Sequence, residues 1–218
     1  EELEEKLAKL KNTQACLVFG SGFLANIGLI PALAGSDDLI LVDELAHACL
    51  NSGARLSGAK VIRFKHNDCA DLENHLTAQR KSSSKCLILT DTVFSMDGDL
   101  APLPELAQLA TKHGAWLMAD DAHGFGVLGS EGRGVCNQFG RTDEVDVICS
   151  SFSKSLAGSG GFVASNQDAI DYMRSHSKQT IFSAALSPAA CATAREALRV
   201  LQSEPEHRER LFKNLERY

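Results

Sequence analysis

Short apolar runs alternate with longer amphipathic stretches from one end of this sequence to the other, and this alternation limits the folds available to it. Strands are predicted at 15–19, 38–42, 59–64, 86–90, 115–119, 146–149 and 161–164. Helices are predicted at 1–10, 23–33, 44–57, 69–79, 103–113, 168–177, 188–202 and 206–218. Strands that alternate with helices of about ten residues are typical of right-handed βαβ units. The sequence therefore predicts one α/β domain over residues 1–218, with three α/β/α layers and a mostly parallel sheet.

Both ends of the sequence lie inside helical patterns. The first residue is Glu1 rather than methionine, and the helical pattern of 1–10 begins with it. The last helical pattern, at 206–218, runs to the final residue. We therefore expect residues 1–218 to be one domain of a longer protein.

Charge and cysteine usage exclude several classes of protein. The net charge of −6 provides no basic surface, so nucleic acid and an anionic membrane are not expected partners. No apolar run approaches the roughly 20 residues of a membrane span, and no signal peptide is recognisable. The seven cysteines are scattered and odd in number, which is typical of reduced thiols in a cytosol. We expect a cytoplasmic protein.

Polar and flexible residues follow four of the predicted strands. In an open parallel sheet, ligands bind beyond the carboxyl ends of the strands. The residues that follow strands are Gly20 to Gly22, Ser95, the pair Asp120 and His123, and the pair Ser151 and Lys154. The sequence therefore predicts a ligand site at this edge, with an amine, a carboxylate, an imidazole, hydroxyls and the start of a helix.

This set of groups suits pyridoxal phosphate. A lysine amine can hold that cofactor covalently as a Schiff base, and a carboxylate can keep its ring nitrogen protonated so that the ring accepts electrons. Hydroxyls and a helix N-terminus can hold the phosphate. The residues predicted for these roles, with one histidine to cover the ring, are Lys154, Asp120, Ser151, Gly22, Phe23 and His47.

Other interpretations of these residues remain open. Asp121 could replace Asp120 as the partner of the ring nitrogen, and Ser95 could do no more than cap a turn. The segment 20–25 fits the loose dinucleotide pattern GxGxxA, which would indicate a nucleotide-dependent oxidoreductase. That function would leave Lys154, Asp120 and His123 without a role.

A metal site is not expected. His66, Asp68, Cys69 and His75 lie close together in the sequence, but their spacing matches no closed tetrahedral set.

Several stretches resemble the α-oxoamine synthases, which are pyridoxal-phosphate enzymes of fold type I. The similar stretches occur in the same order as in that family, at 21–26, 43–48, 64–68, 93–103, 120–129, 132–134 and 151–154. The resemblance implies a C-acyltransferase that condenses an amino acid with an acyl-CoA and releases carbon dioxide. Many members have Gly-Thr where this chain has Ser150 and Ser151.

The resemblance also implies roles for individual residues. Lys154, His47 and Asp120 would be the catalytic residues, with His47 stacked on the cofactor ring. His123 would bind the phenolic oxygen of the cofactor, with Ser95 close by, and Ser151, Gly22 and Phe23 would support cofactor binding. Ser183 resembles a hydroxyl that reaches the phosphate in the neighbouring subunit of a homodimer, which would place the active site at the subunit interface.

Within the family, two stretches indicate the substrate. The run 94–103 and the Asp-Asp-Ala-His sequence at 120–123 are most similar to members that join L-alanine to a pimeloyl thioester in biotin biosynthesis. Members that use glycine or serine remain alternatives. The family's N-terminal segment and its smaller C-terminal domain, which helps to bind the substrate carboxylate, are expected to lie outside this chain.

Overall fold

A computed structural model describes residues 1–217, so Tyr218, the last residue of the predicted helix 206–218, lies outside the described residues. The strands are β1 (Ala15–Phe19), β2 (Leu39–Asp43), β3 (Lys60–Phe64), β4 (Cys86–Asp91), β5 (Trp116–Asp120), β6 (Val147–Ser151) and β7 (Gly161–Ser165). The helices are α1 (Glu2–Lys11), α2 (Gly22–Leu33), α3 (Ala48–Ser57), α4 (Cys69–Gln79), α5 (Leu103–His113), α6 (Val135–Gln138), α7 (Gln167–His176), α8 (Lys178–Ile181), α9 (Pro188–Ser203) and α10 (Glu206–Leu215).

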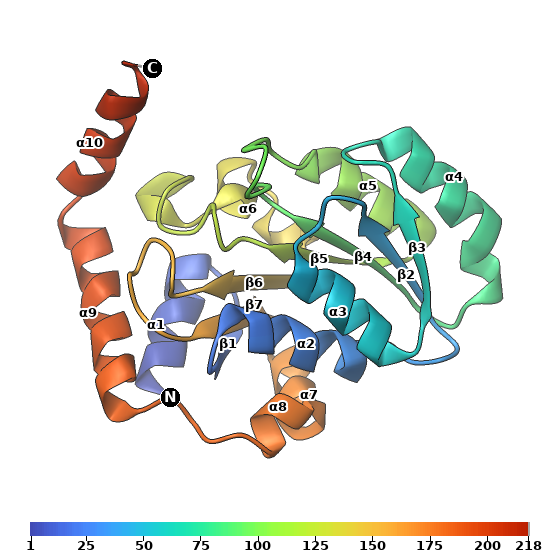
Figure 1. Ribbon diagram of the computed structural model, residues 1–218, viewed down its shortest axis with the longest axis horizontal. Coiled ribbons are helices and arrows are strands. Elements are labelled where there is room, and N and C mark those ends of the chain that lie inside the picture. The colour runs from blue at the N-terminus through green and yellow to red at the C-terminus, as the bar shows by residue number, and fades with distance from the viewer. Residues whose placement is uncertain (218) are drawn as a thin grey trace.

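The strands form one seven-stranded sheet in the order β1-β7-β6-β5-β4-β2-β3 (Figure 1). The five strands from β6 to β3 are parallel, whereas β7 runs antiparallel to both of its neighbours, β6 and β1. The prediction of a mostly parallel sheet is confirmed.

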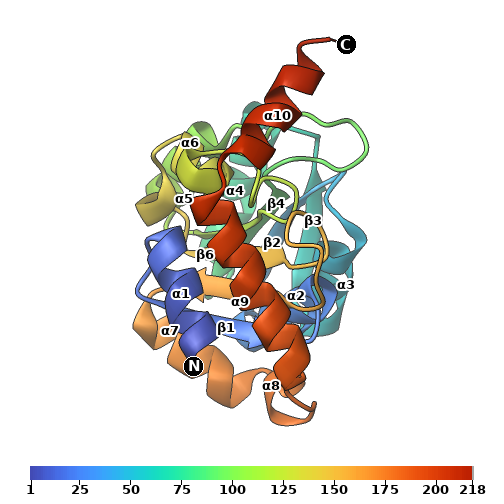
Figure 2. The same ribbon diagram turned by 90° about the vertical axis from the view of Figure 1, so that its left-hand side faces the viewer.

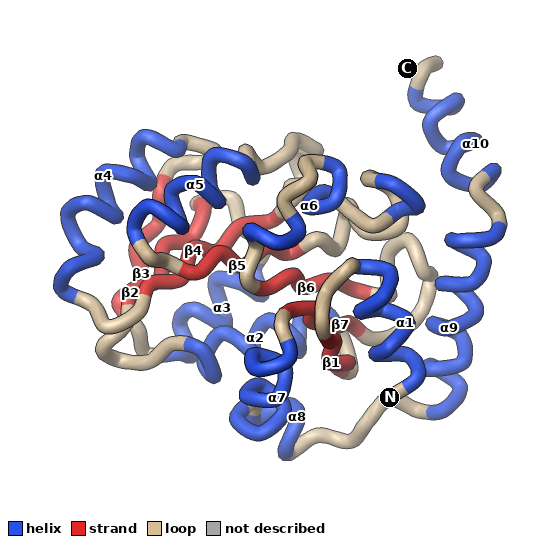
Figure 3. The backbone as a smooth tube through the Cα atoms, turned by 180° about the vertical axis from the view of Figure 1, so that it is seen from behind, coloured by secondary structure: helices blue, strands red, loops and turns tan. Residues whose placement is uncertain are grey.

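Two hydrophobic cores cover the two faces of the sheet. Alternate residues of β2 point to opposite faces, so Leu39 and Leu41 belong to one core while Ile40 and Val42 belong to the other. The first core contains apolar residues of α1, α4, α5, α6 and α9, and the second contains those of α2, α3 and α7 (Figures 1 and 3). The three-layer α/β/α architecture is therefore confirmed.

The C-terminal helices are placed differently from the others. Helix α9 runs beside α1 and buries Ala194 and Leu198, whereas α10 extends beyond the body and buries no residue (Figure 2). Among the described residues, no helix has both the length and the apolar character needed to cross a membrane.

The predicted helix 44–57 begins later in the structure, at Ala48. The Asp43 carboxylate accepts the Leu45 N–H at 2.9 Å, and Ala46 donates its N–H back to the Asp43 carbonyl at 3.0 Å. These bonds form a turn, and His47 then caps α3, its Nδ1 accepting the Cys49 N–H at 3.2 Å. The prediction that His47 lies inside a helix was wrong, because a side chain of the preceding strand bonds the backbone first.

His66 joins the loops that follow β2, β3 and β4. Its Nδ1 lies 2.9 Å from Asp43 Oδ1, and its Nε2 lies 2.7 Å from Asp99 Oδ2. The imidazole also packs edge-on against Phe94, with ring centroids 4.4 Å apart. Burial lowers the pKa of His66, but the two carboxylates outweigh that effect and raise the pKa overall. The two carboxylates therefore favour the protonated ring, which can donate to both of them and join these loops.

The His66 cluster predicts a pH-dependent stability. Because the folded pKa is raised, this stabilisation is complete below the ordinary value of 6.5 and is lost as the pH rises through the folded value. We expect His66→Gln to lower the free energy of unfolding by about 1 kcal/mol at pH 6 and by less at pH 9. Urea unfolding of both proteins at the two pH values measures this. An equal loss at both would contradict it.

Candidate active site

The loops after β1, β2, β4, β5 and β6 meet around a pocket of about 180 Å³. It is lined by Ser21, Gly22, Phe23, His47, Cys49, Asp91, Asp120, Ala122, His123, Ser151, Ser153 and Lys154. All the site residues predicted from the sequence lie here except Ser95 and Ser183. The structure thus brings together side chains from positions more than a hundred residues apart in the chain.

Asp120, the last residue of β5, places a buried carboxyl in the pocket. Its Oδ1 accepts the Ala122 N–H at 3.0 Å, and its Oδ2 accepts from the amide of Asn26 at 2.6 Å. Burial raises the pKa of Asp120, although these two hydrogen bonds oppose the rise. The carboxyl is thus desolvated and bonded only to neutral donors in the residues described. A cationic ligand in the pocket would stabilise its ionised form.

The neighbouring Asp121 points away from the pocket. Its carboxylate lies 2.7 Å from Lys11 Nζ and accepts from Thr92 Oγ1 at 2.7 Å and from the Val135 N–H at 3.1 Å. Successive residues at the end of a strand face opposite sides of a sheet, so only one member of the pair can line the pocket. The geometry favours Asp120 over Asp121 as the ligand-facing carboxyl.

His47 is held at the start of α3 by a second acid. Its backbone N–H donates to Asp91 Oδ2 at 2.7 Å, and its ring Nδ1 lies 2.8 Å from Cys49 Sγ. Burial, and next the negative charge of Asp120, raise the pKa of Asp91 to about 8. Asp91 is therefore largely protonated at neutral pH, which limits the negative charge at the pocket.

Lys154 lies in a loop after β6 that backbone hydrogen bonds hold in shape. Phe152 donates its N–H to the Gly160 carbonyl at 2.9 Å, and Gly158 donates to the Phe152 carbonyl at 2.8 Å. Ser155 Oγ donates to the Phe125 carbonyl at 2.7 Å, which joins this loop to the one that carries His123. The lysine side chain itself is exposed, so its amine is free to react with a ligand in the pocket.

His123 lies beside this lysine. Burial and, to a smaller extent, the charge of Lys154 lower the pKa of His123. Its imidazole is therefore neutral at neutral pH and can donate or accept one hydrogen bond at each nitrogen.

The N-terminus of α2 forms the anion-binding end of the pocket. Ser21 caps the helix by accepting the Leu24 N–H at 3.0 Å, which leaves the first two N–H groups, those of Gly22 and Phe23, for a ligand. A Cβ atom on Gly22 would lie 2.9 Å from Cβ of Ser151. Glycine therefore lets the helix begin against the end of β6, where Ser151 Oγ lies 2.7 Å from Ser153 Oγ.

Ser95 and Ser183 lie outside the pocket lining. Ser95 is exposed in the turn after β4, and Ser183 is exposed after α8, where its hydroxyl donates to the Gln179 carbonyl. The roles predicted for these two residues stay predictions.

Three residues at this site were not predicted from the sequence. Asp91 and Cys49 line the pocket, and Asn26 lies directly behind the lining. Asp91 directly follows the predicted strand 86–90, so the rule that found Asp120 could have found it. Asn26 and Cys49 lie within helices, where neither periodicity nor capping distinguishes them from ordinary helical residues.

The dinucleotide interpretation of 20–25 does not fit this topology. In that pattern the glycine loop follows a strand inside a parallel sheet. Here β1 is an edge strand whose one neighbour, β7, is antiparallel to it. The loop instead points the start of α2 toward Ser151 and Lys154.

The residues considered for a metal site are used elsewhere. His66 bonds Asp43 and Asp99, and His75 pairs with Asp71 at 3.5 Å. Within residues 1–217, the potential metal ligands that do come close together are Glu204, Glu206 and His207, which lie at the surface around the start of α10.

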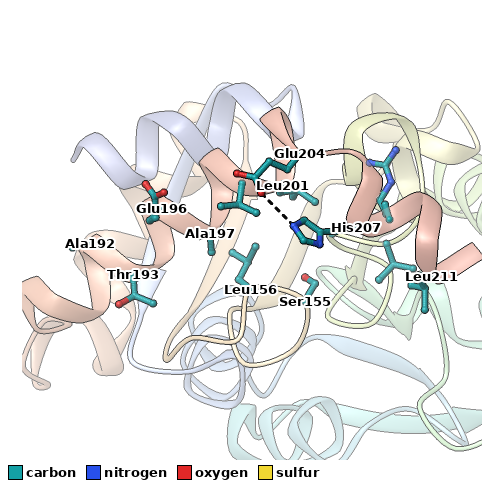
Figure 4. Close-up of a pocket in the computed structure, with 14 residues that line it drawn as sticks. Ser155, Leu156, Ala192, Thr193, Glu196, Ala197, Leu201, Glu204, His207 and Leu211 are labelled. Carbon is teal, nitrogen blue, oxygen red and sulfur yellow. Dashed lines mark hydrogen bonds and ion pairs between the residues drawn. The ribbon is translucent and has the colours of Figure 1, made fainter.

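A second, larger cavity of about 810 Å³ lies between the C-terminal helices and the body (Figure 4). Leu156 and Leu201 face it, and His207 pairs with Glu204 at its edge, 3.2 Å apart. None of the site residues predicted from the sequence lines it. The lysine, carboxyl and imidazole groups predicted from the sequence to act together, those of Lys154, Asp120, His47 and His123, are in the smaller pocket.

Comparison with known proteins gives a consistent result. The family model described as aminotransferase class I and II matches residues 1–218. The chain is 47% identical to serine palmitoyltransferase of Sphingobacterium spiritivorum, covering 98% of this chain and 53% of that protein. It is 48% identical to 8-amino-7-oxononanoate synthase of Beijerinckia indica, covering 94% of this chain and 53% of that protein.

Among solved structures, a variant of serine palmitoyltransferase from S. paucimobilis, with a bound PLP–myriocin aldimine, superposes with a TM-score of 0.93 at 37% identity. That match covers 98% of this chain and 53% of the other. The chain spans about half the length of the curated relatives it matches.

Proposed function

The chain belongs to the aminotransferase class I and II family, and from this premise we propose that it is the cofactor-binding domain of an α-oxoamine synthase. Its cofactor is pyridoxal phosphate, and its fold is the fold type I of pyridoxal-phosphate enzymes. The whole protein joins an amino acid to an acyl-CoA and releases CoA and carbon dioxide. The family's smaller C-terminal domain and N-terminal segment complete the substrate site.

The buried carboxyl of Asp120 is the observation that carries this proposal. It is desolvated, faces a pocket with an amine, and is bonded to neutral donors. Pyridoxal phosphate carries a protonated ring nitrogen, an aldehyde and a phosphate. The pocket has one suitable group for each: the Asp120 carboxylate, the Lys154 amine, and the free N–H groups at the start of α2.

Each residue of the pocket has a separate proposed role in the reaction. When bound, the cofactor supplies an electron sink for negative charge on the substrate α-carbon. Lys154 Nζ would hold the cofactor at its aldehyde carbon, and as a free amine it would move the substrate α-proton. Asp120 would keep the ring nitrogen protonated, and the positive charge there makes the ring electron-withdrawing.

The two histidines would assist at different parts of the cofactor. Neutral His123 donates a hydrogen bond to the phenolic oxygen, with Ser95 close by. His47 would cover the ring and could donate a hydrogen bond to the acyl carbonyl. Ser151, Gly22 and Phe23 hold the phosphate, and Ser183 reaches the phosphate of the partner subunit in a homodimer. The exposed apolar side chains of Ile181 and Phe182, beside Ser183, support such an interface.

The proposed substrates are L-alanine and a pimeloyl thioester, the reaction of 8-amino-7-oxononanoate synthase in biotin biosynthesis. The run 94–103 and the residues 120–123 support this choice. Serine palmitoyltransferase is the alternative, supported by a relative of nearly equal identity, and glycine C-acetyltransferase would use the same residues. We propose a cytoplasmic location, which the seven free thiols support.

An absorbance spectrum of the purified full-length protein tests the proposal. We expect a visible band on addition of pyridoxal phosphate, and we expect borohydride to remove it. L-alanine, glycine and serine are then added separately, and the amino acid that perturbs the band at the lowest concentration identifies the substrate. A colourless protein that takes up no cofactor would exclude the function.

A further inference from the structure

Asn26 lies behind the pocket and contacts three of its parts. It sits one turn into α2, and its side chain is fully buried. The amide Nδ2 donates to Asp120 Oδ2 at 2.6 Å and to the Gly22 carbonyl at 3.2 Å, and it lies 3.2 Å from Cys49 Sγ. Cys49 Sγ in turn lies 2.8 Å from Nδ1 of His47. The Asn26 amide thus contacts the Asp120 carboxyl, the first turn of α2 and the Cys49 thiol, which in turn contacts His47.

The orientation of this amide is determined by its surroundings. Three acceptors surround Nδ2, while Oδ1 has no hydrogen-bond partner among the described residues. A flipped amide would place Oδ1 against the Asp120 carboxylate and the Gly22 carbonyl, which repel it. The donor nitrogen therefore faces Asp120.

We propose that Asn26 is a positioning residue that holds the Asp120 carboxyl and fixes it relative to the first turn of α2. This inference rests on the proposed function. The carboxyl would bind the cofactor's ring nitrogen and the turn would bind its phosphate, so Asn26 sets the spacing between the two ends of one ligand. A hydrogen bond to the charged form of a buried acid favours that form, and here it opposes the effect of burial.

The proposal predicts two effects of Asn26→Ala on cofactor binding. Affinity for pyridoxal phosphate falls about ten- to a hundredfold, the usual effect of losing a hydrogen bond to a buried charged group. The pH dependence of the affinity also changes. Because Asp120 loses a donor, its ionisation moves to higher pH, so the affinity of the variant should rise with pH over a higher range than the affinity of the wild type does.

A double-mutant cycle on the full-length protein separates a positioning role from a general structural one. Dissociation constants for pyridoxal phosphate are measured by absorbance titration for wild type, Asn26→Ala, Asp120→Asn and the double variant. If Asn26 acts through Asp120, the double variant binds about as weakly as Asp120→Asn alone. Asn166→Ala, which removes the cap of α7 far from the pocket, is the matched control and should bind like the wild type.

Asn26→Asp provides a second variant with the same shape, in case Asn26→Ala does not fold. It replaces the donor with an acid, so we expect binding at neutral pH to weaken at least as much as in Asn26→Ala. Unchanged affinity in a folded Asn26 variant, or losses that add in the double variant, would overturn the inference while leaving the function intact. A wild-type protein that binds no pyridoxal phosphate would overturn both.

Discussion

Lys154→Ala is expected to abolish covalent retention of pyridoxal phosphate and to lower turnover by about 10²–10⁴-fold, the usual contribution of a positioned proton-transfer group. Among the described residues, Lys154 is the one lysine that lines the pocket, and it lies on a loop held by the hydrogen bonds of Phe152, Gly158 and Gly160. Because the side chain is exposed, its removal leaves no cavity in the core. We therefore expect normal folding of the variant together with loss of chemistry.

Borohydride reduction followed by peptide mass spectrometry measures this directly. In the wild-type protein, the pyridoxyl mass should appear on the peptide that contains Lys154, and in the variant it should be absent. Lys81→Ala, which changes another exposed lysine, in the short turn after α4, serves as the control and should keep the label. A label that persists in Lys154→Ala, or that maps to a different lysine, would refute the assignment.

The strand-end rule explains why so much of this site could be predicted from the sequence. Asp120, Ser151 and Lys154 each follow a short apolar run, and the carboxyl ends of parallel strands meet at one edge of the sheet. The rule needs only local periodicity to locate the strands. The helices at 69–79 and 103–113 were predicted with the bounds that the structure has, because clear apolar spacing ends there at polar or glycine residues.

The contacts behind the pocket could not be predicted in this way. Asn26 meets Asp120 across 94 positions of sequence, and the pairing depends on how α2 packs on the sheet. The choice between Asp120 and Asp121 also needed the fold, since both follow the same strand. Likewise, the start of α3 depends on Asp43, whose carboxylate bonds the backbone of the following turn. Each of these features is set by tertiary geometry rather than by local pattern.

Lys11→Met is expected to lower the free energy of unfolding by about 3–5 kcal/mol, because it leaves the buried carboxylate of Asp121 without its cation. Lys11 Nζ lies 2.7 Å from Asp121 Oδ2 and 2.5 Å from the Arg133 carbonyl, and the two side chains are 1% and 0% exposed. The ammonium also lies 5.3 Å from the centre of the Phe125 ring. Methionine has a similar length but supplies no charge and no donor, so desolvation of the acid is no longer offset.

The same helix offers a matched control for this prediction. Lys6 also lies on α1 and pairs with an acid, Glu2, at 3.4 Å, but both side chains are about half exposed. Exposed pairs contribute little, so Lys6→Met should change stability by less than about 1 kcal/mol in urea unfolding. Adding Asp121→Asn to Lys11→Met should restore part of the loss, because the neutral amide still accepts from Thr92 and needs no cation. If Lys11→Met were as harmless as Lys6→Met, the buried pair would not be holding α1 to the loop behind the site.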